Sequence, residues 1–208
     1  MKLRYKGVCK DMTKLPSSEL PENAVKFIEP DSKEAFEKAM IPFMIPPLLL
    51  VGAALPIRFL LHGNIGLSIG VSFWWVLPII VVSVFAGMVV HELLHAICFG
   101  KNSEVDIYIS SAFWFVHSVT PISKKRFIFI CLLPNIVLGI IPLLIWLFIP
   151  MSSVMGIIFI FALVMTGSGC GDYMNAYNAF RQMPKGSIQQ GSGMNSYWFM
   201  PDSNDITS

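Results

Sequence analysis

The stretch "VSFWWVLPIIVVSVFAGMVVHELLHAICF" (residues 71–99) determines the fold class of this chain. Residues 71–90 carry no charge, and about 20 mostly apolar residues are what an α-helix needs to cross a bilayer. Directly after them come His91, Glu92 and His95 in the pattern HExxH, which sets two imidazoles one helical turn apart. The stretch therefore predicts a transmembrane helix that ends in a metal-binding motif.

The composition of the whole chain agrees with a membrane location. Of its 208 residues, 54% are hydrophobic and only 13% are charged, whereas soluble domains carry about 25% charged residues. The net charge is +2, and no basic block with interleaved aromatic residues occurs, so we expect no nucleic-acid partner. The four cysteines are scattered and predict no disulfide framework. The expected partner is the lipid bilayer.

Four apolar segments predict an all-α polytopic membrane protein, with transmembrane helices over residues 41–61, 71–99, 127–149 and 154–173. A small β-hairpin is expected at the cytosolic interface. We divide the chain into a cytosolic N-terminal segment (1–38), a four-span membrane domain with the metal site (39–180) and a cytosolic tail (181–208).

The basic residues predict the orientation of these helices. Eight Lys and Arg lie before the first span and four lie in residues 100–126, but none lies in residues 62–70 or 150–153. Cytoplasmic loops of membrane proteins carry the excess of Lys and Arg. We therefore expect a multi-pass protein of the cell membrane with both termini in the cytosol. The sequence predicts no particular oligomeric state.

The HExxH motif predicts zinc chemistry. Zinc suits imidazole ligands, polarises a carbonyl and lowers the pKa of its bound water to about 7. His91 and His95 would hold the ion. Glu92 lies about 100° round the helix, placed to hold the water, to take its proton and to pass that proton to a leaving amine. The alternative is a polar cluster that only caps the helix at the interface.

A catalytic zinc has three protein ligands, so a third residue is needed. Cys98 lies about 10 Å along the helix axis from His91, too far for a short thiol. His117 and Asp106 could approach, but Asp172 fits better, because the second and fourth spans run in the same direction and carry their polar ends at matching depth. The small residues of "GSGCGD" around Asp172 favour close helix packing. The alternative for Asp172 is a carboxylate that only ends a helix.

Two asparagines are further candidates. Asn175 lies three residues beyond Asp172 on the same helical face, where it could orient a substrate or a ligand, or simply end the helix. Asn135 follows Pro134 within the third span, and we expect it to bond to backbone groups that the proline leaves without a partner.

The segment "VDIYISSAFWFVHS" (residues 105–118) predicts the hairpin, because it is β-branched, aromatic and nearly alternating. It could be an interfacial aromatic belt, or a strand edge that holds an unwound substrate by β-augmentation. In the second case, proline at Ile107 or Ile109 should block the edge. His117 could then stabilise an oxyanion, or be an ordinary interfacial histidine.

The segments "HELLHAICFG" and "GDYMNAY", two spans apart, resemble the site-2 protease class of intramembrane metalloproteases. The four-span form is more similar to the small bacterial zincin peptidase family, a domain of otherwise unknown function, over most of the chain from about residue 15. This resemblance implies a zinc metallopeptidase that hydrolyses peptide bonds of membrane or membrane-proximal protein substrates near the cytosolic face. The competing prediction is a non-enzymatic zinc-stabilised membrane scaffold or regulatory binding protein.

Overall fold

The computed structural model describes residues 1–30, 32–65, 73–110, 114–150 and 153–201. The chain divides into two compact units, each built from distant segments, and each is described by itself. The helical unit comprises Asp31–His91 and Leu133–Met174. The mixed unit comprises Met1–Pro30, Glu92–Leu132 and Asn175–Ser208. Three helices, α3 (Phe73–Ile97), α4 (Lys124–Asn135) and α7 (Cys170–Gln182), contribute to both units.

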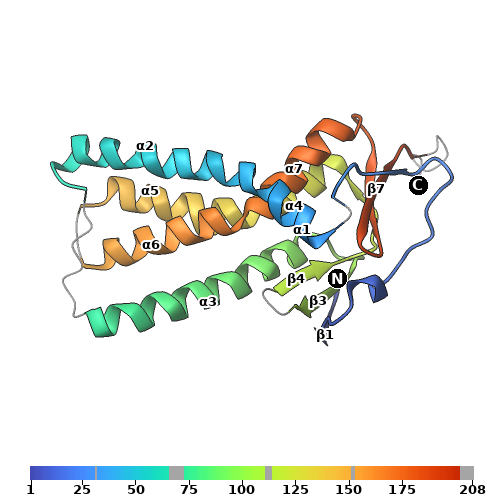
Figure 1. Cartoon of the computed structure of the whole chain (residues 1–208), viewed down its shortest axis with the longest axis horizontal. Helices are drawn as coiled ribbons and strands as arrows, with labels where there is room; N and C mark the ends of the chain where they lie inside the picture. Colours follow the sequence, from blue (N-terminus) through green and yellow to red (C-terminus); the bar gives the residue numbers. More distant parts are fainter. Residues whose placement is uncertain (31, 66–72, 111–113, 151–152, 202–208) are drawn as a thin grey trace. The chain divides into compact units, whose positions relative to one another are not determined.

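The helical unit is built from helices, most of which are apolar. Besides its parts of the shared helices it contains α1 (Lys33–Met40), the 3₁₀ turn η2 (Ile41–Met44), α2 (Ile45–His62), the π-helical segment η3 (Ile136–Ile140), α5 (Ile141–Phe148) and α6 (Ser153–Ser168). Figure 1 shows α5 between α2 and α6. These three helices share a hydrophobic core that includes Trp146 and Phe159, whose ring centroids are 4.4 Å apart.

In the part of the chain that the structure describes, three helices are long and apolar enough to cross a membrane: Glu34–His62, Trp74–Ile97 and Lys124–Phe148. A fourth span is possible if the bent pair Val154–Ser168 and Cys170–Gln182, which meet at 44°, counts as one. The three single helices overlap the predicted spans 41–61, 71–99 and 127–149, whereas the predicted span 154–173 falls on the bent pair and is not one continuous helix. They are compatible with a multi-pass membrane protein.

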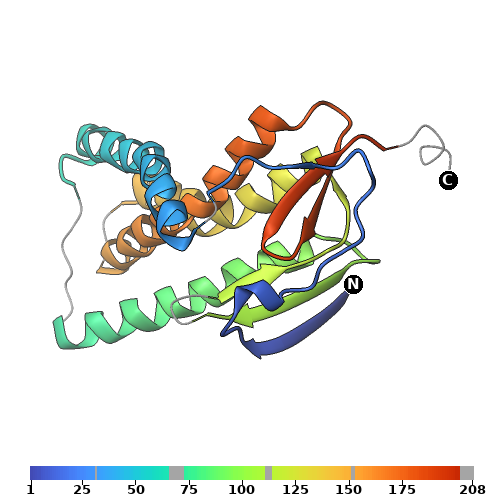
Figure 2. The same ribbon diagram turned by 45° about the vertical axis from the view of Figure 1, so that its right-hand side comes forward.

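The described residues of the mixed unit form two β-sheets, and one of them includes the predicted hairpin. In the first sheet the strand order is β1 (Lys2–Val8), β3 (Glu104–Ile109), β4 (Trp114–His117). Strands β3 and β4 pair antiparallel, which confirms the hairpin, and β1 pairs with β3 in parallel. In Figures 1 and 2, β4 is the strand of this sheet nearest to the C-terminal end of α3.

The second sheet has the order β2 (Val25–Lys26), β7 (Asn195–Phe199), β6 (Ile188–Ser192), β5 (Ile122–Ser123). A 3₁₀ turn, η1 (Met12–Lys14), precedes it in the chain. Phe27, Ala179 and Met183 form a buried cluster beside this sheet, with Phe127 and Trp198 packed against it.

The prediction of an all-α protein is wrong, because both terminal segments contribute strands. In β1 the basic residues Lys2 and Arg4 alternate with apolar ones, and they pair with carboxylates of β3; Arg4 Nε lies 2.7 Å from Asp106 Oδ1. In the tail, Gly193 has φ 59° and turns the chain between β6 and β7. The boundaries proposed at residues 38 and 180 stay a prediction.

One detail of the predicted hairpin is also wrong. Ile107 and Ile109 lie on β3, which is the central strand and pairs on both sides. Within the described residues the outer strand of the hairpin is β4. Proline at Ile107 or Ile109 would therefore break pairing inside the sheet and would not test an exposed edge.

Candidate metal centre

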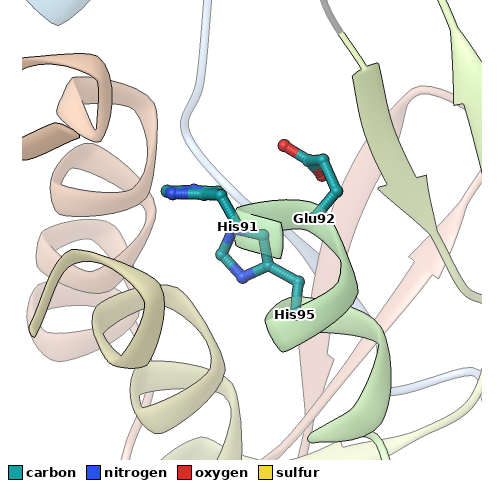
Figure 3. Close-up of side chains that lie close together, drawn as sticks. All are labelled: His91, Glu92 and His95. Carbon is teal, nitrogen blue, oxygen red and sulfur yellow. The ribbon is translucent and has the colours of Figure 1, made fainter. Parts of the chain in front are cut away.

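Helix α3 brings three side chains of the HExxH motif together. Ligand atoms of His91, Glu92 and His95 all lie within 4.8 Å of one another. Both histidines are buried, with 8% and 9% of their surface exposed. Figure 3 shows the two imidazole rings on the same side of the helix, with the Glu92 carboxylate beside them. The spacing of i and i+4 on an α-helix produces this arrangement without any help from the rest of the fold.

Within the helical unit, Asp172 contacts His91. Its Oδ2 atom lies 3.0 Å from His91 Nε2. Zinc takes imidazole nitrogen and carboxylate oxygen as ligands, so these two atoms lie close enough together to be candidates for holding one ion. Asp172 lies in the first turn of α7, where the helix dipole favours a negative charge.

Asn135 positions this carboxylate, a role that sequence reasoning missed. Its Nδ2 donates a hydrogen bond of 2.9 Å to Asp172 Oδ2, and the residue is 1% exposed. The sequence pointed instead to a bond between Asn135 and the backbone. A buried amide inside an apolar span is costly and commonly marks function, and that signal could have singled out Asn135.

Gly169, at the break between α6 and α7, gives Asn135 its space. A Cβ atom at this glycine would lie 1.6 Å from Asn135 Oδ1 and 2.4 Å from its Cγ. Such distances are far inside van der Waals contact, so no larger residue fits while Asn135 stays in place. The prediction that the small residues before Asp172 allow close approach is confirmed at this position.

Within the mixed unit, the main chain of α4 orients His95. Its Nδ1 lies 2.9 Å from the main-chain carbonyl oxygen of Ile130, within a buried hydrogen bond. A carbonyl can only accept, so Nδ1 carries the hydrogen and donates it. Nε2 is then the nitrogen with a lone pair for a metal.

Two other candidates have different partners. His117 Nε2 donates to the main-chain oxygen of Gly193 at 3.0 Å, and burial lowers the pKa of His117. A neutral histidine that donates through Nε2 has no hydrogen on Nδ1 for an oxyanion, which favours the ordinary structural role. Asp106 is 3% exposed and forms an ion pair with Arg4.

Asn175 is half-buried on α7. Its predicted role in orienting a substrate or a ligand stays a prediction.

Residues 84–188 match a protein family described as "Putative zincin peptidase". This match covers half of the chain. The chain belongs to this family. No curated protein and no solved structure matches the chain.

The residues of this zincin family member fit zinc. Two imidazole nitrogens and a carboxylate oxygen are ligands that zinc takes in catalytic sites. The match includes the whole HExxH motif and Asp172. Two of these side chains also have a protein partner outside the ligand set: the Ile130 carbonyl contacts Nδ1 of His95, and Asn135 donates to the Asp172 oxygen that faces His91. Such partners are typical of metal-binding side chains.

Proposed function

We propose that this protein is a membrane-embedded zinc metallopeptidase that hydrolyses peptide bonds of membrane or membrane-proximal proteins near the cytosolic face. One observation carries the proposal: a second helix places the Asp172 carboxylate 3.0 Å from His91, a member of the HExxH motif. A helix-capping polar cluster would not need a third side chain of a ligand type beside the two histidines, whereas a catalytic zinc does.

In this proposal His91, His95 and Asp172 hold the ion. Zinc, when bound, supplies a Lewis acid and an activated water for attack on the peptide carbonyl. Glu92 accepts the proton from the attacking water and donates it to the leaving amine. Its half-buried position beside the two imidazoles supports this role, because a general base must lie within hydrogen-bond reach of the water.

The substrate is proposed to bind as an extended strand along β4. A transmembrane helix cannot be cut as it stands, because its carbonyls are tied in the helix ladder. An outer strand offers replacement main-chain hydrogen bonds with little sequence preference. Support comes from the place of β4: within the described residues it is one of the two outer strands of its sheet, and of these it is the one nearer to the C-terminal end of α3.

The membrane setting is part of the proposal. The apolar helices support a multi-pass protein, and the Lys and Arg distribution supports the cell membrane with both termini cytosolic. The partners are then the lipid bilayer and a protein or peptide substrate.

Glu92→Gln tests the enzymatic part, with His91→Ala as the metal-deficient control. Wild-type protein and each variant are purified, and the zinc content of each is measured. Each is then reconstituted with a mixture of single-span membrane proteins, and new peptide termini are sought by mass spectrometry. The proposal expects wild-type protein to produce new termini, and Glu92→Gln to keep zinc and produce none. Cleavage by Glu92→Gln at the wild-type rate would refute the role of Glu92 as the general base. Zinc-loaded wild-type protein that cuts nothing would favour the non-enzymatic scaffold.

A further inference from the structure

Helix α4 contains a proline, Pro134, inside its last turn. Proline has no N–H group, so the usual α-helical hydrogen bond from residue 134 to the carbonyl of Ile130 cannot form. A buried carbonyl without its helical partner needs another donor. Ile130 is 4% exposed, so bulk water does not serve this role well.

The donor that reaches this carbonyl is His95. The distance from His95 Nδ1 to the Ile130 oxygen is 2.9 Å, and His95 itself is 9% exposed. In the neutral imidazole one nitrogen carries the hydrogen and the other carries the lone pair. This contact therefore selects the Nδ1–H tautomer and fixes the plane of the ring.

We infer that Pro134 is a positioning residue for the metal centre. By withholding an N–H group it keeps the Ile130 carbonyl available to His95, which presents Nε2 to the metal. The role toward zinc rests on the proposed function, but the choice of tautomer does not. Any other residue at position 134 would supply an N–H that competes with His95 for the same oxygen.

The first test measures the tautomer in metal-free protein. The chain has only four histidines, so ¹⁵N-detected imidazole spectra can be assigned by single substitutions. Wild-type His95 is expected to carry its hydrogen on Nδ1 alone. In Pro134→Ala a mixture of tautomers is expected, because the N–H of the new residue competes for the carbonyl. A hydrogen on Nε2 in the wild type, or an unchanged His95 in Pro134→Ala, would overturn the inference.

The second test measures zinc affinity by competition with a chelator. Loss of a partner of a metal ligand typically weakens binding about 10–100-fold, and this is expected for Pro134→Ala. The matched control is Pro56→Ala, which changes an exposed proline inside α2 and should leave affinity unchanged. Equal affinities in the two variants would contradict the inference.

A third variant separates the missing N–H from the proline ring. Replacement of Pro134 by lactic acid, through an ester bond, removes both the ring and the N–H group. It is expected to restore the wild-type tautomer and most of the zinc affinity. An ester variant as weak as Pro134→Ala would show that the ring matters instead. If wild-type protein bound no zinc, the proposed function would fail while the tautomer result still decided this inference.

Discussion

Gly169→Ala is the substitution whose effect follows most directly from the structure. Gly169 has no positive φ, so its backbone conformation suits alanine. Space is the obstacle, because the new methyl group would lie 1.6 Å from Asn135 Oδ1. Asn135 is 1% exposed and short, so its amide must leave its place and with it the 2.9 Å hydrogen bond to Asp172.

Two contributions set the size of this effect. Overpacking in a well-packed core costs about 1–3 kcal/mol. A hydrogen bond to a charged group contributes about 1.5–3 kcal/mol, and its loss would leave Asp172 less well oriented. Zinc affinity should therefore fall about 10–100-fold, as it does when other partners of metal ligands are removed. The thermal midpoint of the metal-free protein should fall as well.

The matched control is Gly167→Ala, two residues earlier, where an added Cβ would meet nothing within 4 Å. Both variants are compared with wild type in detergent, by zinc competition and by thermal unfolding. Gly167→Ala should behave as wild type or unfold at a slightly higher temperature, since alanine favours a helix over glycine. If Gly169→Ala bound zinc and unfolded like Gly167→Ala, the role assigned to Asn135 would be refuted.

Three further predictions concern the ligand set, the pH response and the topology. Asp172→Ala should lose most of its zinc while His117→Ala keeps it. The reverse result would show that His117, and not Asp172, is the third ligand. Burial lowers the pKa of His117 from its ordinary 6.5, so the unfolded chain binds the proton first and the free energy of unfolding falls as the pH drops below about 6.5. In His117→Gln this free energy should fall less over the same pH range. An equal fall in both proteins would contradict the prediction. A reporter fused after Ser208 should face the cytosol, and a cysteine near Asn64 should be labelled from outside; the opposite pattern would invert the topology.

The apolar helices could be predicted from the sequence because each span is a local property of its own residues. The β3–β4 hairpin could be predicted as well, because its two strands are adjacent in the sequence. The complete sheets could not, because the pairings β1–β3, β2–β7 and β5–β6 join segments that are distant in the chain. Strand β1 pairs with β3 about 100 residues later, and its three basic residues read as a polar tail until Glu104 and Asp106 are placed beside them. A parallel pairing also lacks the short turn that identifies a hairpin.

In the candidate metal site, too, the features that depend on local sequence could be predicted and the others could not. His91, Glu92 and His95 follow from helical periodicity alone, and Asp172 follows from the direction of two spans. Asn135 and the Ile130 carbonyl depend on details that no local pattern specifies: the close approach at Gly169 and the hydrogen bond that Pro134 cannot make. Proline and glycine in apolar helices are common, so neither residue alone indicated a role.

X-ray absorption at the zinc edge of the purified wild-type protein tests the central claim most directly. With His91, His95 and Asp172 as ligands, the spectrum should show imidazole scattering and only nitrogen or oxygen neighbours at about 2.0–2.2 Å. Glu92→Gln should give the same spectrum, since Glu92 is not a ligand in this account. A zinc–sulfur distance of about 2.3 Å, or protein without zinc, would contradict it.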